Sequence, residues 1–217
     1  MSPYPAATVT SRRESSRRHD RRRAAIRRRS LLTLVAVAAA LLVVIATLPL
    51  FRTAVDHFNL PLAYQDVIRQ QATAKRLDPA LIAAVIYTET KFQPRPSSAG
   101  AQGLMQILPD TARFLAKRSG ASTFTVADLA TPRVNIAYGS YYLRYLLGEY
   151  GGSTVLALAA YNGGEANVNR WLSSAHARGR HFRLSDIPFP ETRAYVSRVL
   201  WAQRQYRRAY AAALGYA

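Results

Sequence analysis

Glu89 is the residue in this sequence whose setting first suggests chemistry. It is the only acidic residue between Asp78 and Asp110, and it follows the apolar run PALIAAVIYT, which begins at Pro79. Burial disfavours the ionised form of a carboxyl group, and the carboxyl-terminal end of a helix dipole does the same. Both effects would raise the pKa of Glu89 and keep it protonated near neutral pH, which is the state that a general acid needs.

The spacing of this run leaves the direction of the Glu89 side chain open. Leu81, Val85 and Glu89 are four residues apart, so they share one face of a helix, and that face should point to the core. A glutamate at a helix end can equally turn to solvent and pair with Lys91. The helix alone favours neither interpretation.

Three later segments carry residues suited to binding a sugar. The segment SSAGAQGLMQ is rich in Gly and Ser and leads into Met105 and Gln106. Glycine permits close backbone approach, and an amide side chain can both donate and accept hydrogen bonds. The segment AAYNGG puts an aromatic residue and an amide at a helix end, and ETRAYV puts Glu191 and Tyr195 on one helical face. Taken singly, the first is weak evidence, and the others also fit an ordinary helix stop and a surface pair.

The ordered segments ETKF, GLMQI, AYNGG and ETRAYV resemble the motifs of a known family. That family is the lytic transglycosylase domain of the soluble lytic transglycosylase type, which belongs to the lysozyme-like superfamily alongside goose-type lysozyme. The resemblance covers roughly Tyr64 to Tyr206 and includes DPALIAAVI ahead of Glu89 and VNIAYGSYYLRYLL between the second and third motifs. A single motif has little specificity, but the ordered set is highly specific.

The resemblance implies roles for individual residues of this chain. Glu89 matches the family's single catalytic acid/base, and Thr90 stands where the family usually has Ser. A substrate-site Ser of the family matches Ser97 by its spacing to Gly100, and Ser98 is the alternative because this segment is one residue shorter than usual. The other residues implied to bind substrate are Met105, Gln106, Tyr161, Asn162, Glu191 and Tyr195, the last reaching toward the catalytic Glu.

The reaction that the resemblance implies is a non-hydrolytic cleavage of peptidoglycan at the β-1,4 bond between N-acetylmuramic acid and N-acetylglucosamine. Protonated Glu89 would donate to the glycosidic oxygen, and the C6 hydroxyl of the muramic residue would close a 1,6-anhydro ring. The acidic residues agree with this, because most glycosidases need two carboxyl groups and only Glu89 has an obvious apolar setting. No metal or organic cofactor is implied.

Two other functions stay open at this point. A hydrolytic muramidase would use water and a second carboxyl group such as Glu191. A non-catalytic peptidoglycan-binding module of an envelope machine is disfavoured, because Glu89 and its motif partners are all present.

The elements that must position these residues are almost all helical. Apolar periodicity and cap residues predict helices over residues 64–76, 79–90, 109–118, 132–150, 154–162, 165–172 and 190–212, with a loop over 173–189. The predicted fold is mostly α: a lysozyme-like helical globular domain over residues 64–212, large enough to bury a core and preceded by one transmembrane helix.

Three further parts are predicted in the first 63 residues. Residues 1–30 carry ten Arg and two acidic residues, which predicts a disordered, Arg-rich cytoplasmic tail. Residues 31–51 have no charge and suit a transmembrane signal-anchor helix, and the Arg-rich flank would put the catalytic domain on the periplasmic side of a bacterial inner membrane. Residues 52–63 are predicted to be a linker. The alternative for 31–51 is a cleaved signal peptide, whose apolar region would usually be shorter.

Composition excludes several chemistries and favours an acidic partner. The chain has no Cys, which excludes disulfides, thiolate metal sites and catalytic thiols, and the spacing of its four His matches no strong metal site. Residues 61–217 hold 19 basic and nine acidic residues, so the domain should be drawn to peptidoglycan, an acidic polymer. Nucleic acid is not an expected partner, because membrane topology and anionic lipid already explain the Arg tail.

Overall fold

The computed structural model describes residues 37–39, 41–47, 60–95, 97 and 99–216. By its internal contacts the chain divides into two compact units, Met1–Phe58 and Asn59–Ala217.

Much of the predicted amino-terminal organisation lies outside the described residues. This is true of the tail, of residues 52–59 of the linker, and of part of the predicted anchor over 31–51. Residues 37–39 and 41–47 are helical, and their side chains are exposed. In the described part of the chain, no helix combines the length and the apolar character that a membrane crossing requires.

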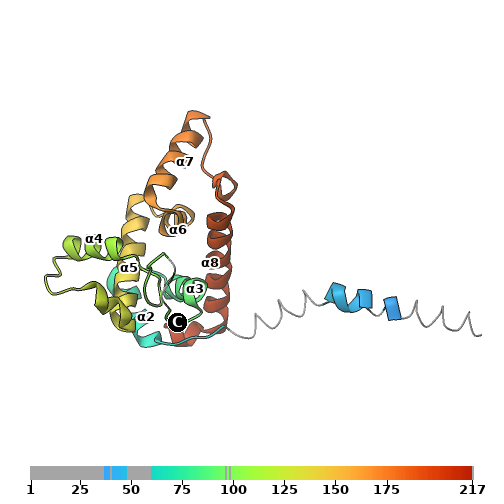
Figure 1. Cartoon of the computed structure of the whole chain (residues 1–217), viewed down its shortest axis with the longest axis horizontal. Coiled ribbons are helices and arrows are strands. Elements are labelled where there is room, and N and C mark those ends of the chain that lie inside the picture. The colour runs from blue at the N-terminus through green and yellow to red at the C-terminus, as the bar shows by residue number, and fades with distance from the viewer. Residues whose placement is uncertain (1–36, 40, 48–59, 96, 98, 217) are drawn as a thin grey trace, which may run out of the picture. The chain divides into compact units, whose positions relative to one another are not determined.

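Helices make up nearly all the regular structure of the second unit, as the sequence predicts (Figure 1). They are α2 (Gln65–Lys75), α3 (Pro79–Thr90), α4 (Pro109–Ser119), the 3-10 helix η1 (Val126–Ala130), α5 (Pro132–Glu149), α6 (Thr154–Gly163), α7 (Glu165–Ala177), the 3-10 helix η2 (Leu184–Asp186), α8 (Pro190–Ala209) and α9 (Ala211–Leu214). Within the described residues, extended pairing is limited to one isolated antiparallel bridge between Gln102 and Ile107.

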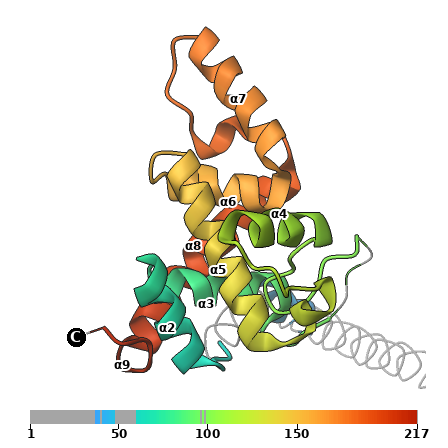
Figure 2. The same ribbon diagram turned by 90° about the vertical axis from the view of Figure 1, so that its left-hand side faces the viewer.

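Helix α7 is longer than the sequence suggests. It was expected to end near Leu172, but it continues to Ala177 because Ala175 lies two turns beyond Val168 and is buried on the same side. The far end of α7 projects away from the other helices of the unit, and the chain returns from that end to the start of α8 (Figures 1 and 2).

Helix α3 is the centre of the core. Its apolar run is buried, as the sequence indicates, because Ala80, Ile82, Ala83, Ala84, Val85 and Ile86 all have no exposed surface. A helix that is apolar on every side must be surrounded by other elements, and α8 and α2 both pack against it. Glu89 therefore extends from the end of a helix that is covered on every side.

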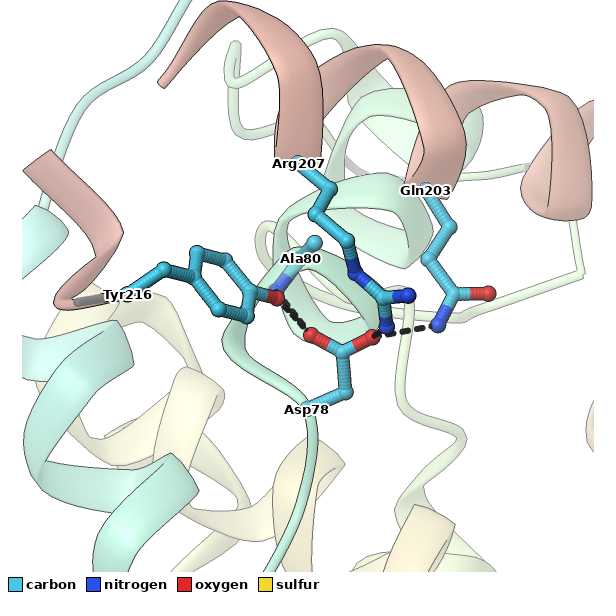
Figure 3. Close-up of polar contacts among 5 residues, drawn as sticks. All are labelled: Asp78, Ala80, Gln203, Arg207 and Tyr216. Atoms are coloured by element: carbon cyan, nitrogen blue, oxygen red, sulfur yellow. Dashed lines mark hydrogen bonds and ion pairs between the residues drawn. The ribbon is translucent and has the colours of Figure 1, made fainter. Parts of the chain in front are cut away.

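Asp78 joins the start of α3 to the carboxyl-terminal half of α8, as Figure 3 shows. Its carboxylate accepts a hydrogen bond from the backbone N–H of Ala80 at 2.9 Å, which confirms the predicted N-cap. The same carboxylate accepts from Gln203 Nε2 at 2.6 Å, from the Arg207 guanidinium and from the Tyr216 hydroxyl. One partly buried acidic group thus fixes the position of α3 relative to α8 and the last turn of the chain.

Two tyrosines of the same region hold the start of the domain. The Tyr206 hydroxyl donates to the carbonyl oxygen of Pro61 and the Tyr210 hydroxyl to that of Leu60, both at 2.6 Å. Leu60 is itself buried. Among the described residues, Leu60 is thus the first of the packed domain.

Replacing Asp78 by Ala removes the cap of α3 and the shared acceptor at its start. We expect the free energy of unfolding at neutral pH to fall by about 2–3 kcal/mol, because a lost N-cap costs about 1 kcal/mol and unpaired, partly buried donors add to it. Urea unfolding of wild type and variant measures this difference. Asp78→Asn, which keeps a capping oxygen without the charge, should lose less.

The contribution of Asp78 should also depend on pH. Burial alone would raise the pKa of Asp78, but the hydrogen bonds from Tyr216, Gln203, Arg207 and Ala80 outweigh burial and hold the pKa below 3.8. A carboxyl group with a lowered folded-state pKa stabilises the fold above its unfolded-state pKa and loses that effect as the pH falls through the folded-state value. The difference between wild type and Asp78→Ala should therefore be complete at neutral pH and shrink below about pH 4. A difference unchanged in strong acid would contradict this account.

Candidate active site

The Glu89 carboxyl group is bonded to α8. The Tyr195 hydroxyl donates to Glu89 Oε1 at 2.7 Å, and Tyr195 is only 3 % exposed. The start of α3 is bonded to the carboxyl-terminal half of α8 through Asp78, whereas the end of α3 is bonded to the beginning of α8 through Glu89. The two helices therefore run antiparallel, and their two polar ties lie at opposite ends of the same interface.

Burial dominates the acidity of Glu89. It raises the pKa of Glu89 from 4.5 to about 7, although the hydrogen bond from Tyr195 and the positive charge of Arg198 both act to lower it. Burial likewise raises the pKa of Tyr195 well above 10, and the Glu89 charge adds to this, so the tyrosine stays a donor. The pair can thus hold a proton on the carboxyl group near neutral pH or stabilise the carboxylate once the proton has left.

The end of α3 is joined to the segment GLMQI by Thr90. Its hydroxyl donates to the carbonyl oxygen of Leu104 at 2.8 Å and also lies 3.2 Å from the carbonyl oxygen of Ile86. Thr90 is 3 % exposed, so this is a buried polar tie. Thr90 and the Ser that usually stands at this position share a hydroxyl group, and in this chain that hydroxyl fixes the loop relative to Glu89.

Asn135 of α5 holds the same loop from the other side. Its Oδ1 accepts from the backbone N–H of Met105 at 2.8 Å, and its Nδ2 donates to the carbonyl oxygens of Gln102 at 2.9 Å and Leu129 at 3.1 Å. Gly103 lies so close that a Cβ there would be 2.1 Å from Asn135 Nδ2. The fully buried Asn135 thus replaces the backbone pairing that the loop lacks.

Met105 links this loop to α6. The Tyr161 hydroxyl donates to the carbonyl oxygen of Met105 at 2.7 Å. The Met105 side chain is buried against Gly139, where a Cβ would lie 2.4 Å from the sulfur. Burial raises the pKa of Tyr161 well above 10, and the nearby Glu89 charge contributes. Tyr161 therefore lies within electrostatic reach of Glu89 while anchoring the loop.

The remaining predicted residues bond to the loop backbone or are exposed at helix ends. Ser97 shapes the loop, because its Oγ accepts from the backbone N–H of Ala101 at 3.0 Å. Gln106 Nε2 donates to the carbonyl oxygens of Arg95 and Gly103 at 2.7 and 2.8 Å. Two residues are exposed at helix ends, Asn162 near the end of α6 and Glu191 in the first turn of α8. The alternative serine, Ser98, lies outside the described residues.

Three residues near the site carried no separate signal in the sequence. Asn135 stood out only as part of the segment VNIAYGSYYLRYLL, and nothing marked it as buried. Tyr142 packs on Tyr161 with ring centroids 5.2 Å apart, and Arg198 acts on Glu89 through its charge. A charged residue one turn beyond Tyr195 on α8 was the available clue to Arg198.

The described residues contain no group of three or more His, Asp or Glu side chains able to hold a metal ion.

Comparison with known proteins identifies a family over the same elements. Residues 66–182 match the family described as Transglycosylase SLT domain. The soluble lytic murein transglycosylase of Escherichia coli is 34% identical over 157 residues, which are 70% of this chain and 24% of that protein. The membrane-bound lytic murein transglycosylase C of Yersinia enterocolitica is 33% identical over 167 residues, which are 67% of this chain and 47% of that protein.

A solved structure gives the same result for the fold. An inactive Glu-to-Gln mutant of the lytic transglycosylase Slt from Pseudomonas aeruginosa matches with a TM-score of 0.65 and 33% identity, covering 70% of this chain and 25% of that chain. This chain therefore spans between a quarter and a half of the length of these relatives. The family match contains Glu89 and Tyr161, and Tyr195 lies beyond it. With this match over more than half of its residues, the chain belongs to the transglycosylase SLT domain family, a family of lytic transglycosylase enzymes, as its four ordered motifs predict.

Proposed function

We propose that this protein is a peptidoglycan lytic transglycosylase in which Glu89 is the single acid/base. The observation that carries the proposal is the partly buried carboxyl group bonded to Tyr195, with a pKa of about 7, in a domain of this family. The Pseudomonas relative that is inactive as a Glu-to-Gln mutant supports an essential glutamate in such domains.

Glu89 acts twice in the proposed reaction. Its proton passes to the glycosidic oxygen as the bond from that oxygen to C1 of N-acetylmuramic acid breaks, and N-acetylglucosamine leaves with a new hydroxyl. The Glu89 carboxylate then takes the proton of the muramic C6 hydroxyl, whose oxygen attacks C1 and closes the 1,6-anhydro ring. The proton removed in the second step restores the one given in the first, and no water is consumed.

Tyr195 and the loop have separate proposed tasks. The Tyr195 hydrogen bond stabilises the carboxylate that forms between the two proton transfers. Thr90, Asn135 and Tyr161 hold the backbone of Leu104 and Met105 at a constant position beside Glu89. The proposed substrate contacts from the resemblance are Ser97 or Ser98, Gln106, Tyr161, Asn162 and Glu191. Met105 and Tyr195, also implied by the resemblance, are buried, so their proposed task is to position the loop and Glu89.

We also propose that residues 31–51 anchor the enzyme in the bacterial inner membrane, with the catalytic domain on the periplasmic side. The uncharged stretch of 21 residues and its Arg-rich flank support this topology. The similarity to a relative named membrane-bound lytic murein transglycosylase C is consistent with a membrane-associated enzyme of this type.

Glu89→Gln should abolish product release while leaving the fold intact. Wild-type protein incubated with purified sacculi should release muropeptides ending in 1,6-anhydro-N-acetylmuramic acid, detected by mass spectrometry. The variant cannot donate the proton, so its rate should fall at least about a thousandfold. Reducing ends in place of anhydro ends would instead identify a hydrolytic muramidase. Binding without any products would identify a non-catalytic module.

Tyr195→Phe should change the pH dependence in a defined direction. Because the protonated acid starts the reaction, the wild-type rate should decline as pH rises through about 7. The Tyr195 hydrogen bond lowers the pKa of Glu89, so its removal should move this decline in rate to higher pH.

Arg198→Gln is the matched control for this pH profile. It removes the other group that lowers the pKa of Glu89, so the fall in rate with rising pH should also move to higher pH in this variant. Arg198 is exposed, so its effect should disappear in high salt, whereas that of the buried Tyr195 should persist.

The Tyr195→Phe result can refute the assignment of Glu89 as the titrating acid. It would do so if the fall in rate with rising pH stayed at the wild-type pH or moved to lower pH.

A further inference from the structure

The segment from α7 to the start of α8, residues 165–189, forms an arm whose two ends lie at the candidate site. Tyr161 and Asn162 come just before it on α6, and Glu191 and Tyr195 come just after it on α8. The arm extends away from the rest of the domain (Figures 1 and 2).

The base of the arm is closed against α8. A Cβ at Gly163 would lie 3.1 Å from Thr192 Oγ1, so the end of α6 rests on the first turn of α8. Trp171 of α7 packs edge-on against Phe189, with ring centroids 5.1 Å apart. These contacts fix the arm next to the turn of α8 that leads to Tyr195.

The arm is a packed structure whose buried residues Val168 and Ile187 belong to the hydrophobic core of the domain. Val168, Ala175 and Ile187 are buried along it. Asp186 accepts from the backbone N–H of Arg183 at 2.8 Å and pairs with Arg180 at 3.3 Å, which closes the returning segment. The side chains on its surface are therefore carried by a defined backbone.

Those surface side chains are basic. Between Glu165 and Asp186 the sequence has no acidic residue. Over the same stretch it exposes Arg170, His176, Arg178, Arg180, His181 and Arg183. Only Arg180 of this set forms an ion pair among the described residues. A concentration of one charge on a projecting element attracts an anionic partner.

We propose that this basic arm binds the carboxylate groups of the short peptides carried by the same glycan strand that is cleaved at Glu89. The inference rests on the proposed function, which brings a peptide-bearing strand to the base of the arm. Helix α7, with 13 residues, is about 20 Å long, and an extended peptide of four or five residues reaches roughly 15 Å. The substituents of the bound strand are thus the anions within reach of the exposed arginines.

The test compares two double variants with equal charge loss in the full chain. Arg178→Gln with Arg183→Gln removes arm charges that form no ion pair with the described acidic residues. Arg204→Gln with Arg208→Gln removes two exposed charges from the far half of α8 and is the matched control. Both are made on a Glu89→Gln background, so that binding to sacculi can be measured by pelleting without turnover.

The arm variant should bind peptide-bearing sacculi about threefold to tenfold more weakly than the parent, because each exposed charge contact is worth up to about fivefold in affinity. The control should bind like the parent. On glycan strands stripped of peptides by an amidase, the arm variant and the parent should bind equally. The difference on intact sacculi should narrow as salt is raised, since exposed charges are screened within about 10 Å at 0.1 M salt.

Three results would overturn the proposal: equal loss in the control variant, equal loss on peptide-free strands, or disappearance of the loss after phosphate-containing wall polymers are extracted. The last would assign the arm to phosphate groups. Binding is measured without turnover, so it does not depend on the reaction. Failure to find 1,6-anhydro products in the activity assay would refute the proposed reaction, and the binding test of the arm could still be interpreted.

Discussion

The site depends on the loss of water around the Glu89 carboxyl group, which the antiparallel packing of α8 on α3 produces. Every side of α3 is covered, so the residue that follows Thr88 cannot be fully hydrated even at the end of the helix. Burial raises the pKa of Glu89 to about 7, and the hydrogen bond from Tyr195 moderates the rise. Because the pKa of Glu89 is higher in the folded than in the unfolded chain, the ionised form of the folded protein is destabilised by about 3 kcal/mol at a pH where Glu89 is ionised in both. The tie at Asp78, at the other end of the same two helices, helps to offset that cost.

A second constraint sets the loop opposite Glu89. The segment around Met105 has almost no regular backbone pairing, so its polar groups need other partners. Asn135, Thr90 and Tyr161 supply them from α5, α3 and α6 respectively. Three helices thus converge on two consecutive peptide units, Leu104 and Met105. A loop held in this way can present its backbone to a ligand at constant geometry, as a preorganised site requires.

Local signals were sufficient where one residue type determines the structure. Helix positions could be predicted because their signals affect only neighbouring residues. These signals are the N-cap at Asp78, the prolines that start four helices and the glycines that end helices. The direction of the Glu89 side chain could not be predicted, because it depends on α8, which is about a hundred residues away in the chain. The glycines of SSAGAQGLMQ indicate close backbone approach, but at Gly103 the group that approaches is the Asn135 side chain. Sequence spacing cannot distinguish an approach to a substrate from an approach to the protein's own buried amide.

The isolation of Glu89 is a geometric property of the domain, and it bears on the chemistry. Asp78 lies at the opposite end of α3, about 16 Å away along the helix axis, whereas paired glycosidase carboxyl groups lie roughly 5–10 Å apart. Glu165 lies in the first turn of α7, and Glu191 is exposed in the first turn of α8. The proposed reaction suits a site with one carboxyl group, because the carboxylate that gave its proton takes one back from a hydroxyl of the substrate itself.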